Sequence, residues 1–237
     1  MASLYFRERS SEKEILDDFN LKDNDLSQNL KELERVNTLL GGYAPVLAML
    51  ERIKPELQKR PLVRITDVGC GGGDVLRRVH HWCQKNRINA RLIGLDGNLH
   101  VVELAREFSH TYSGIDWQVV NVFSPEFGDH TADVFMFNLF LHHFQEEEIV
   151  ALLKKCRTGC RFLIINDLQR SRLAYQLFRL ASRVFRFSYI SRHDGKLSIR
   201  KSFTKGDWVR MLQEAGISRY RIKWQWAFRY SVLITFS

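Results

Sequence analysis

Residues 67–74 read Asp67-Val68-Gly69-Cys70-Gly71-Gly72-Gly73-Asp74, a cluster of glycines bounded by two aspartates. The preceding residues 62–66 are β-branched and apolar, as in a buried strand, and residues 75–82 have the spacing of a helix. The glycines therefore occupy a strand-to-helix turn. Unpaired N–H groups and the positive end of the helix dipole at such a turn favour a polar or anionic ligand group. The stretch predicts a nucleotide-type cofactor site.

The glycine spacing departs from the dinucleotide-binding pattern G-x-G-x-x-G, because Asp74 stands where the third glycine would be. The pattern is G-x-G-x-G instead. A second predicted strand ends in Ile93-Gly94-Leu95-Asp96, which places Asp96 25 residues after Gly71. A carboxylate there can accept hydrogen bonds from two ribose hydroxyls, so we expect Asp96 to bind a ribose.

Strands and helices alternate along the rest of the chain, as in a doubly wound α/β sheet. A helix is expected at about 145–157 and another from Thr204 to Gly216. Strands are expected at residues 62–66, 93–96, 118–123, 132–138, 161–168, 217–224 and 227–236. Ligands bind beyond the carboxyl ends of the strands in such sheets. Polar residues or glycine fall at these ends, namely Gly69, Asp96, Asn121, Asn138 and Asp167.

The segment from Asp67 to Gly73 resembles the first motif of the class I S-adenosylmethionine-dependent methyltransferases, over a likeness that spans roughly residues 60 to 237. The segment Leu139-Phe140-Leu141-His142-His143-Phe144 also resembles the post-strand segment of small-molecule members. The resemblance implies a Rossmann-like, mostly parallel seven-stranded sheet with an antiparallel last strand, flanked by helices. It also implies S-adenosyl-L-methionine as cofactor and S-adenosyl-L-homocysteine as product.

The resemblance assigns the cofactor-binding residues. The glycine turn would hold the amino-acid end of the cofactor, assisted by Asp67 or Asp74, and Asp96 would hold the ribose. Asn121 and its neighbour Val122 would lie near the adenine, where Asp is commoner in the family. The full predicted set is Asp67, Gly69, Gly71, Gly73, Asp74, Asp96, Asn121, Val122 and Asn138.

The chain divides into a helical extension over residues 1–60 and a methyltransferase domain over 61–237, with a lid insertion at about 169–203. Whether the N-terminal helices cap the cofactor cleft or pack on the sheet edge is left open. In the insertion, one helix face carries the apolar residues Leu173, Leu177, Leu180, Val184 and Phe187. Another carries Arg172, Arg179, Arg183 and Arg186. We favour a lid with the apolar face over the cavity and the arginines in water, rather than contact with a membrane surface.

Methyl transfer gains much of its rate from positioning and from excluding water, and a phenolic acceptor also gains from a base. His143 is the first candidate base, although it could instead pack or cap the following helix. His193 is the second, with an exposed turn beside Asp194-Gly195 as its plainer explanation. No metal is expected, because Asp167 and Asn138 alone are too few oxygen ligands.

The expected function is O-methylation of a small aromatic or apolar molecule, phenolic or of polyketide type. A lipid-like quinone precursor at a membrane surface, an RNA substrate and a cofactor-binding scaffold without turnover are alternatives. The net charge of +9 alone favours RNA, but Asn138 is not followed by the Pro-Pro-aromatic loop of base-amine methyltransferases, so nucleic acid is not expected. The four cysteines form no Cys-x-x-Cys pair, and no signal peptide or uncharged span is evident, which predicts a cytoplasmic protein. A homodimer is left open.

Overall fold

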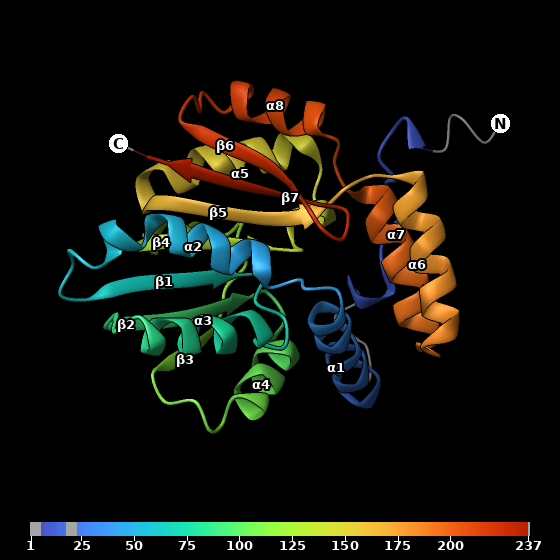
Figure 1. The fold of residues 1–237 in the computed structure, drawn as a ribbon, viewed down its shortest axis with the longest axis horizontal. Coiled ribbons are helices and arrows are strands. Elements are labelled where there is room, and N and C mark those ends of the chain that lie inside the picture. The colour runs from blue at the N-terminus through green and yellow to red at the C-terminus, as the bar shows by residue number, and fades with distance from the viewer. Residues whose placement is uncertain (1–5, 18–22, 237) are drawn as a thin grey trace.

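The computed structural model describes residues 6–17 and 23–236. Seven strands form one sheet in the order β3-β2-β1-β4-β5-β7-β6, and β7 runs antiparallel to both of its neighbours (Figure 1). The strands are β1 (Val63–Val68), β2 (Ala90–Asp96), β3 (Ile115–Val119), β4 (Ala132–Asn138), β5 (Cys160–Leu168), β6 (Tyr220–Gln225) and β7 (Arg229–Thr235). This is the predicted Rossmann-like fold with its single antiparallel strand.

Helices cover both faces of the sheet. On one face lie α2 (Ala44–Leu57), α3 (Asp74–Lys85) and α4 (Leu99–Phe108), and on the other α5 (Glu146–Gly159) and α8 (Lys205–Glu214). Because both faces are covered, the central strands are apolar on both sides, and residues 134–137 and 162–165 show this continuous pattern. Thr204 caps α8 with a reciprocal bond to Asp207, where the sequence predicts the helix to begin.

A third group of helices lies beyond the carboxyl ends of the parallel strands (Figure 1). It contains α1 (Asp23–Leu39), α6 (Arg172–Val184), α7 (Tyr189–Lys201) and the short 3₁₀ helix η2 (Ile15–Asp17). Contacts link α7 to α6, α1 and η2. Two further 3₁₀ helices are η3 (Pro125–Asp129) and η4 (Leu141–His143). The extension and the insertion, far apart in sequence, therefore meet at the same end of the sheet.

Three details of the sequence reading were wrong. The turn expected beside Asp194-Gly195 is instead part of α7, where Gly195 permits close packing because a Cβ there would lie 2.2 Å from Phe178 Cζ. The third strand spans Ile115–Val119 rather than residues 118–123, because the Asn121 side chain accepts a bond from Phe123 N at 3.0 Å and turns the chain. The predicted apolar stripe is divided, because Leu173, Leu180 and Val184 are 58%, 61% and 68% exposed, whereas Leu177 and Phe187 line the cavity.

The four cysteines are buried free thiols. Within the described residues, none of the helices combines the length and apolar character needed to cross a bilayer.

Candidate active site

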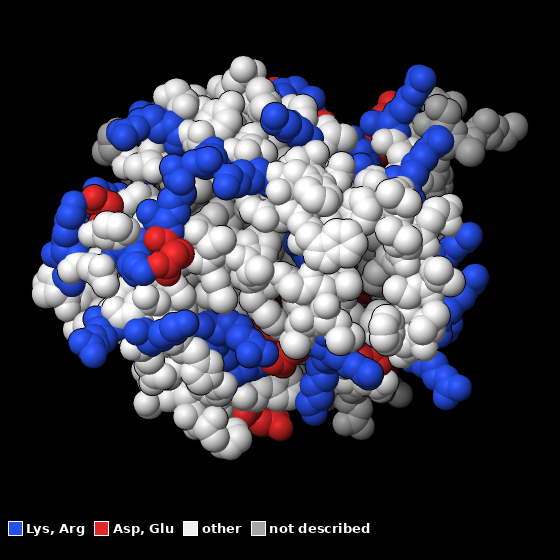
Figure 2. All heavy atoms as spheres, in the orientation of Figure 1, with Lys and Arg blue, Asp and Glu red and all other residues white. Residues whose placement is uncertain are grey.

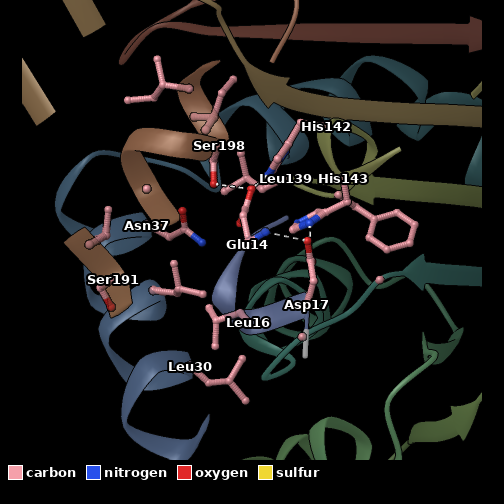
Figure 3. Close-up of a pocket in the computed structure, with 18 of the residues that line it drawn as sticks. Glu14, Leu16, Asp17, Leu30, Asn37, Leu139, His142, His143, Ser191 and Ser198 are labelled. Carbon is pink, nitrogen blue, oxygen red and sulfur yellow. Dashed lines mark hydrogen bonds and ion pairs between the residues drawn. The ribbon is translucent and has the colours of Figure 1, made fainter. Parts of the chain in front are cut away.

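A cavity of about 660 Å³ opens at the carboxyl edge of the sheet. One end is formed by the glycine turn and by the loops after β2, β3 and β4, and the other by α1, α6, α7 and the β6–β7 turn. Most of its surface is apolar, with a few polar groups near the middle (Figure 3). Size and lining are those of a small-molecule site.

The glycine turn exposes its backbone to the cavity. Gly69, Gly71 and Gly73 have φ angles of 72°, 50° and 76°, in the left-handed region that glycine adopts readily. A Cβ on Gly69 would lie 2.0 Å from Phe140 Cδ2, and one on Gly73 would lie 2.3 Å from Trp117 Cη2. Gly71 faces open space, since its nearest neighbour would be Leu30 at 3.9 Å. Gly69 and Gly71 line the cavity, whereas Gly73 packs behind the turn and begins α3.

Asp96 joins the end of β2 to the glycine turn. Its carboxylate accepts hydrogen bonds from Gly71 N at 3.2 Å and from Asn98 N at 3.0 Å, and it lines the cavity. Burial raises the pKa of this carboxyl, against the backbone bonds that lower it. Asp96 is therefore placed to accept ligand hydroxyl groups on the cavity side.

Asp67 and Asp74 stand behind the turn rather than on the cavity wall. Asp74 accepts bonds from Tyr43 Oη at 2.8 Å and Asn37 Nδ2 at 3.2 Å, and so ties α3 to the first two helices. Asp67 is 1% exposed, and its Oδ1 has no hydrogen-bond partner among the described residues. Burial and the charges of Asp74 and Asp96 raise the pKa of Asp67 well above its usual value. A cationic ligand would relieve this accumulation of carboxylates, and the sulfonium and ammonium of S-adenosylmethionine fit that requirement.

The two predicted adenine-side residues, Asn121 and Val122, also line the cavity. Asn138 does not. Its Oδ1 accepts a bond from Asn166 Nδ2 at 2.7 Å, and the same amide contacts Gly42 O at 3.1 Å. Asn138 thus joins the ends of β4 and β5 to the chain after α1.

His143 lies on η4, directly after β4, and lines the cavity. Its Nδ1 forms an ion pair with Asp17 Oδ1 at 2.8 Å (Figure 3). Burial opposes protonation of His143, but the contact with Asp17 and the charge of Glu14 outweigh it and raise the pKa of the imidazole. The pKa of Asp17 is lowered in turn, because its contacts with His143 and Lys201 outweigh its burial.

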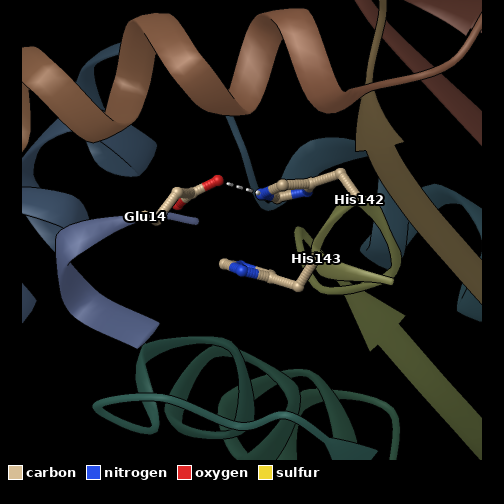
Figure 4. Close-up of side chains that lie close together, drawn as sticks. All are labelled: Glu14, His142 and His143. Carbon is tan, nitrogen blue, oxygen red and sulfur yellow. Dashed lines mark ion pairs between the residues drawn. The ribbon is translucent and has the colours of Figure 1, made fainter. Parts of the chain in front are cut away.

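His142 is the better oriented of the two histidines. Its Nδ1 lies 2.7 Å from Asp167 Oδ1, and its backbone N–H donates to Asp167 Oδ2 at 3.2 Å. Its Nε2 lies 3.7 Å from Glu14 Oε1 (Figure 4). Burial would raise the pKa of Asp167, but His142 outweighs burial and lowers it. No local motif predicts this role for His142, but His142 follows β4 and Asp167 lies at the end of the neighbouring β5, which is a signal for pairing them.

Glu14 and Asp17 come from the N-terminal segment and were not anticipated. Glu14 accepts a hydrogen bond from Ser198 Oγ at 3.0 Å, and Lys201 Nζ lies 3.6 Å from Glu14 Oε1 and 3.4 Å from Asp17 Oδ2. Ligand atoms of Glu14, His142 and His143 lie within 4.8 Å of one another, a spacing that could admit a cation. The Lys201 ammonium already balances the Glu14 charge, which suits proton transfer better than metal binding.

Of two further residues with ionisable side chains, the predicted His193 lies outside the cavity wall and the unpredicted Arg229 lines it. His193, the second predicted base, sits on α7 outside the cavity wall, with Nδ1 2.9 Å from Asp194 Oδ1. Arg229 begins β7, is 2% exposed and lines the cavity, and its Nε has no bonding partner in the described part of the chain. Burial lowers the pKa of Arg229 to about 10, with the nearby Asp167 opposing the shift. Arg229 could not be predicted as a cavity residue, because a single arginine at a strand start carries no motif.

A family model described as a methyltransferase domain matches residues 65–161. The chain carries a methyltransferase domain. The match spans the glycine turn, Asp96 and the histidine pair, and with the site geometry it identifies an S-adenosylmethionine-dependent methyltransferase of class I, as the sequence predicts. No curated protein matches the chain significantly in sequence.

Solved structures share the methyltransferase fold at low sequence identity. The plantazolicin methyltransferase BpumL in complex with SAH is 15% identical, with a TM-score of 0.62 over 91% of this chain and 95% of that one. The magnesium protoporphyrin IX methyltransferase ChlM from Synechocystis PCC 6803 with bound SAM is 16% identical, with a TM-score of 0.56 over 88% and 84%. An O-methyltransferase family 2 protein from Planctomyces limnophilus in complex with apigenin is 15% identical, with a TM-score of 0.54 over 74% and 50%.

Proposed function

We propose that this methyltransferase transfers the methyl group of S-adenosylmethionine to a hydroxyl of a small aromatic or apolar molecule, phenolic or of polyketide type. The observation that carries the proposal is one continuous cavity that joins the glycine turn to an apolar chamber, with His143 between them. The chamber wall includes Leu177, Phe178 and Phe187. The neighbouring structures named for plantazolicin and apigenin support an acceptor of this size.

The geometry of the cavity supports a specific set of cofactor contacts. Asp96 would hold the ribose, the backbone of Gly69 and Gly71 would contact the amino-acid end, and Asn121 and Val122 would border the adenine. Asp67 would balance the positive charge from behind the turn. When bound, the cofactor supplies an electrophilic methyl group on a sulfonium. The apolar chamber excludes water from it and aligns the acceptor oxygen, which accounts for much of the rate in such transfers.

The histidines would remove the acceptor proton. A phenol has an intrinsic pKa near 10, so a base assists its reaction at neutral pH. We assign this role to His143, whose imidazolium Asp17 would stabilise. His142, oriented by Asp167, lines the cavity beside it and could take the same proton through Nε2. The buried cation of Arg229 would stabilise negative charge on the acceptor oxygen.

Transfer of labelled methyl into organic-extractable and acid-precipitable fractions of a cell lysate tests the proposal. We expect label in the organic fraction, and we expect His143→Ala to reduce it while cofactor binding persists. Label confined to the precipitate would refute the small-molecule assignment in favour of RNA or protein.

A further inference from the structure

The outer face of α6 carries an apolar stripe that the rest of the described chain leaves uncovered. Leu173, Leu180 and Val184 are 58%, 61% and 68% exposed. They repeat at the helical spacing of seven and four residues, so they lie in one row along the helix. Phe185 and Tyr189, at and beyond the end of α6, extend the exposed surface. Large apolar side chains grouped in this way mark an interaction surface.

A row of arginines runs beside the stripe. Arg179 and Arg183 each precede an exposed apolar residue by one position, which sets them about 100° round the helix from it. Arg186 follows just after the end of α6, and all three arginines are exposed. Figure 2 shows Lys and Arg side chains along the edge of the molecule where α6 lies, beside a broad uncharged area. Among the described residues, no carboxylate pairs with these three guanidinium groups.

The arginines beside the apolar stripe of α6 determine which kind of partner this surface can bind. A symmetric dimer through α6 would bring the arginine rows of two copies together, in a chain that already carries a net charge of +9. Like charges placed so close oppose association. An anionic surface with an apolar interior can contact both the apolar row and the arginine row. Arginine side chains lie along apolar surface and place their charges among phosphates.

We propose that α6 docks this methyltransferase on an anionic lipid bilayer, with the leucine and valine row at the acyl boundary and the arginine row among the headgroups. The inner side of the same helix supplies Ala174, Phe178 and Ala181 to the cavity wall. One helix, about 10 Å thick with its side chains, therefore separates the docked membrane from the cavity. An apolar acceptor dissolved in the bilayer would be concentrated next to the site.

Flotation of the full-length protein with vesicles tests the proposal. One set of vesicles contains phosphatidylcholine alone, and the other contains phosphatidylcholine with about 30% phosphatidylglycerol. We expect binding to the anionic vesicles that weakens with salt, and little binding to the neutral ones. Each arginine near such a surface contributes about 1 kcal/mol, or roughly fivefold in binding, so a triple Arg→Gln variant at positions 179, 183 and 186 should bind roughly 100-fold more weakly.

Two further triple variants distinguish docking through α6 from a general effect of the positive charge of the protein. Leu173→Gln with Leu180→Gln and Val184→Gln should lose vesicle binding while methylating a water-soluble phenol at the wild-type rate, since none of the three lines the cavity. The matched control carries Arg52→Gln, Arg157→Gln and Arg221→Gln, three exposed residues on other elements, and should bind nearly as well as wild type.

Equal vesicle binding by the stripe variant and the wild type would overturn the proposal, as would equal losses in the arginine variant and its control. Sedimentation velocity without lipid provides an independent check. A dimer that the stripe variant dissolves would overturn the proposal in favour of self-association. Vesicle flotation and sedimentation do not depend on catalysis, so a failure of the proposed O-methylation would leave both measurements interpretable.

Discussion

Asp96→Ala should weaken S-adenosylmethionine binding more than any other single change at the cofactor end. The Asp96 carboxylate borders the cavity and is fixed by N–H donors from Gly71 and Asn98 at 3.2 and 3.0 Å, so it needs no rearrangement to accept ligand hydroxyls. Hydrogen bonds to a charged group contribute about 1.5 to 3 kcal/mol each. Two ribose hydroxyls therefore account for roughly 3 to 6 kcal/mol, or about 10²- to 10⁴-fold in affinity at 1.4 kcal/mol per tenfold.

Calorimetric titration with S-adenosylmethionine and with S-adenosylhomocysteine measures this loss. Asp116→Ala is the matched control, because it also removes one carboxylate, on the neighbouring strand β3, but breaks only a surface ion pair with Arg91 at 2.9 Å. Its affinity should stay close to that of the wild type. A folded Asp96→Ala protein that binds S-adenosylmethionine within about threefold of wild type would refute the ribose assignment.

Four further outcomes are expected. His143→Ala should lower kcat by about 10² to 10⁴ with unchanged cofactor affinity, and wild-type turnover across pH would remove it as the base. The activity of the wild type should rise with pH through the raised pKa of His143, because only the neutral imidazole accepts a proton; Asp17→Asn removes a cause of that shift and should move the rising limb to lower pH. Cofactor affinity should fall on acidification as Asp96 becomes protonated. Because burial raises the pKa of Asp96, this loss should begin at a higher pH than for an exposed aspartate, and a calorimetric affinity that does not change with pH would contradict this. Gly69→Ala should lose cofactor binding or folding, since its Cβ would lie 2.0 Å from Phe140 Cδ2, and thermal melts with titrations would separate the two.

The sheet could be predicted because each strand carries its own signal. Strands buried on both faces are short apolar runs, and the residues at their carboxyl ends then share one edge of the sheet. The same logic predicts that Gly69, Asp96 and Asn121 lie at one edge of the sheet, and all three line the cavity. It also placed Asn138 at the correct strand end, although its side chain is engaged behind the cavity wall.

The acceptor end could not be predicted in the same way. Glu14 and Asp17 are held near the histidines by a contact between segments far apart in the sequence. Asp194 on α7 accepts hydrogen bonds from Ile15 N and Leu16 N at 2.9 Å each. No local pattern encodes a contact across roughly 180 residues of sequence, as the separations of 179 and 178 show. The orientation of α6 was missed for a related reason, since amphipathicity shows that a helix has an apolar face but not what covers it.

The Asp194 contact also has a consequence for how this enzyme can diversify. The cofactor end is built within residues 65–161, the span that the family model matches, whereas the carboxylates facing His142 and His143 come from outside it. Substitutions at the flanking carboxylates can therefore change the groups that face the histidines while the matched span keeps its own sequence. The matched span supplies the glycine turn and the histidines, the two flanks supply the carboxylates that face the histidines, and the hydrogen bonds of Asp194 hold the flanks together.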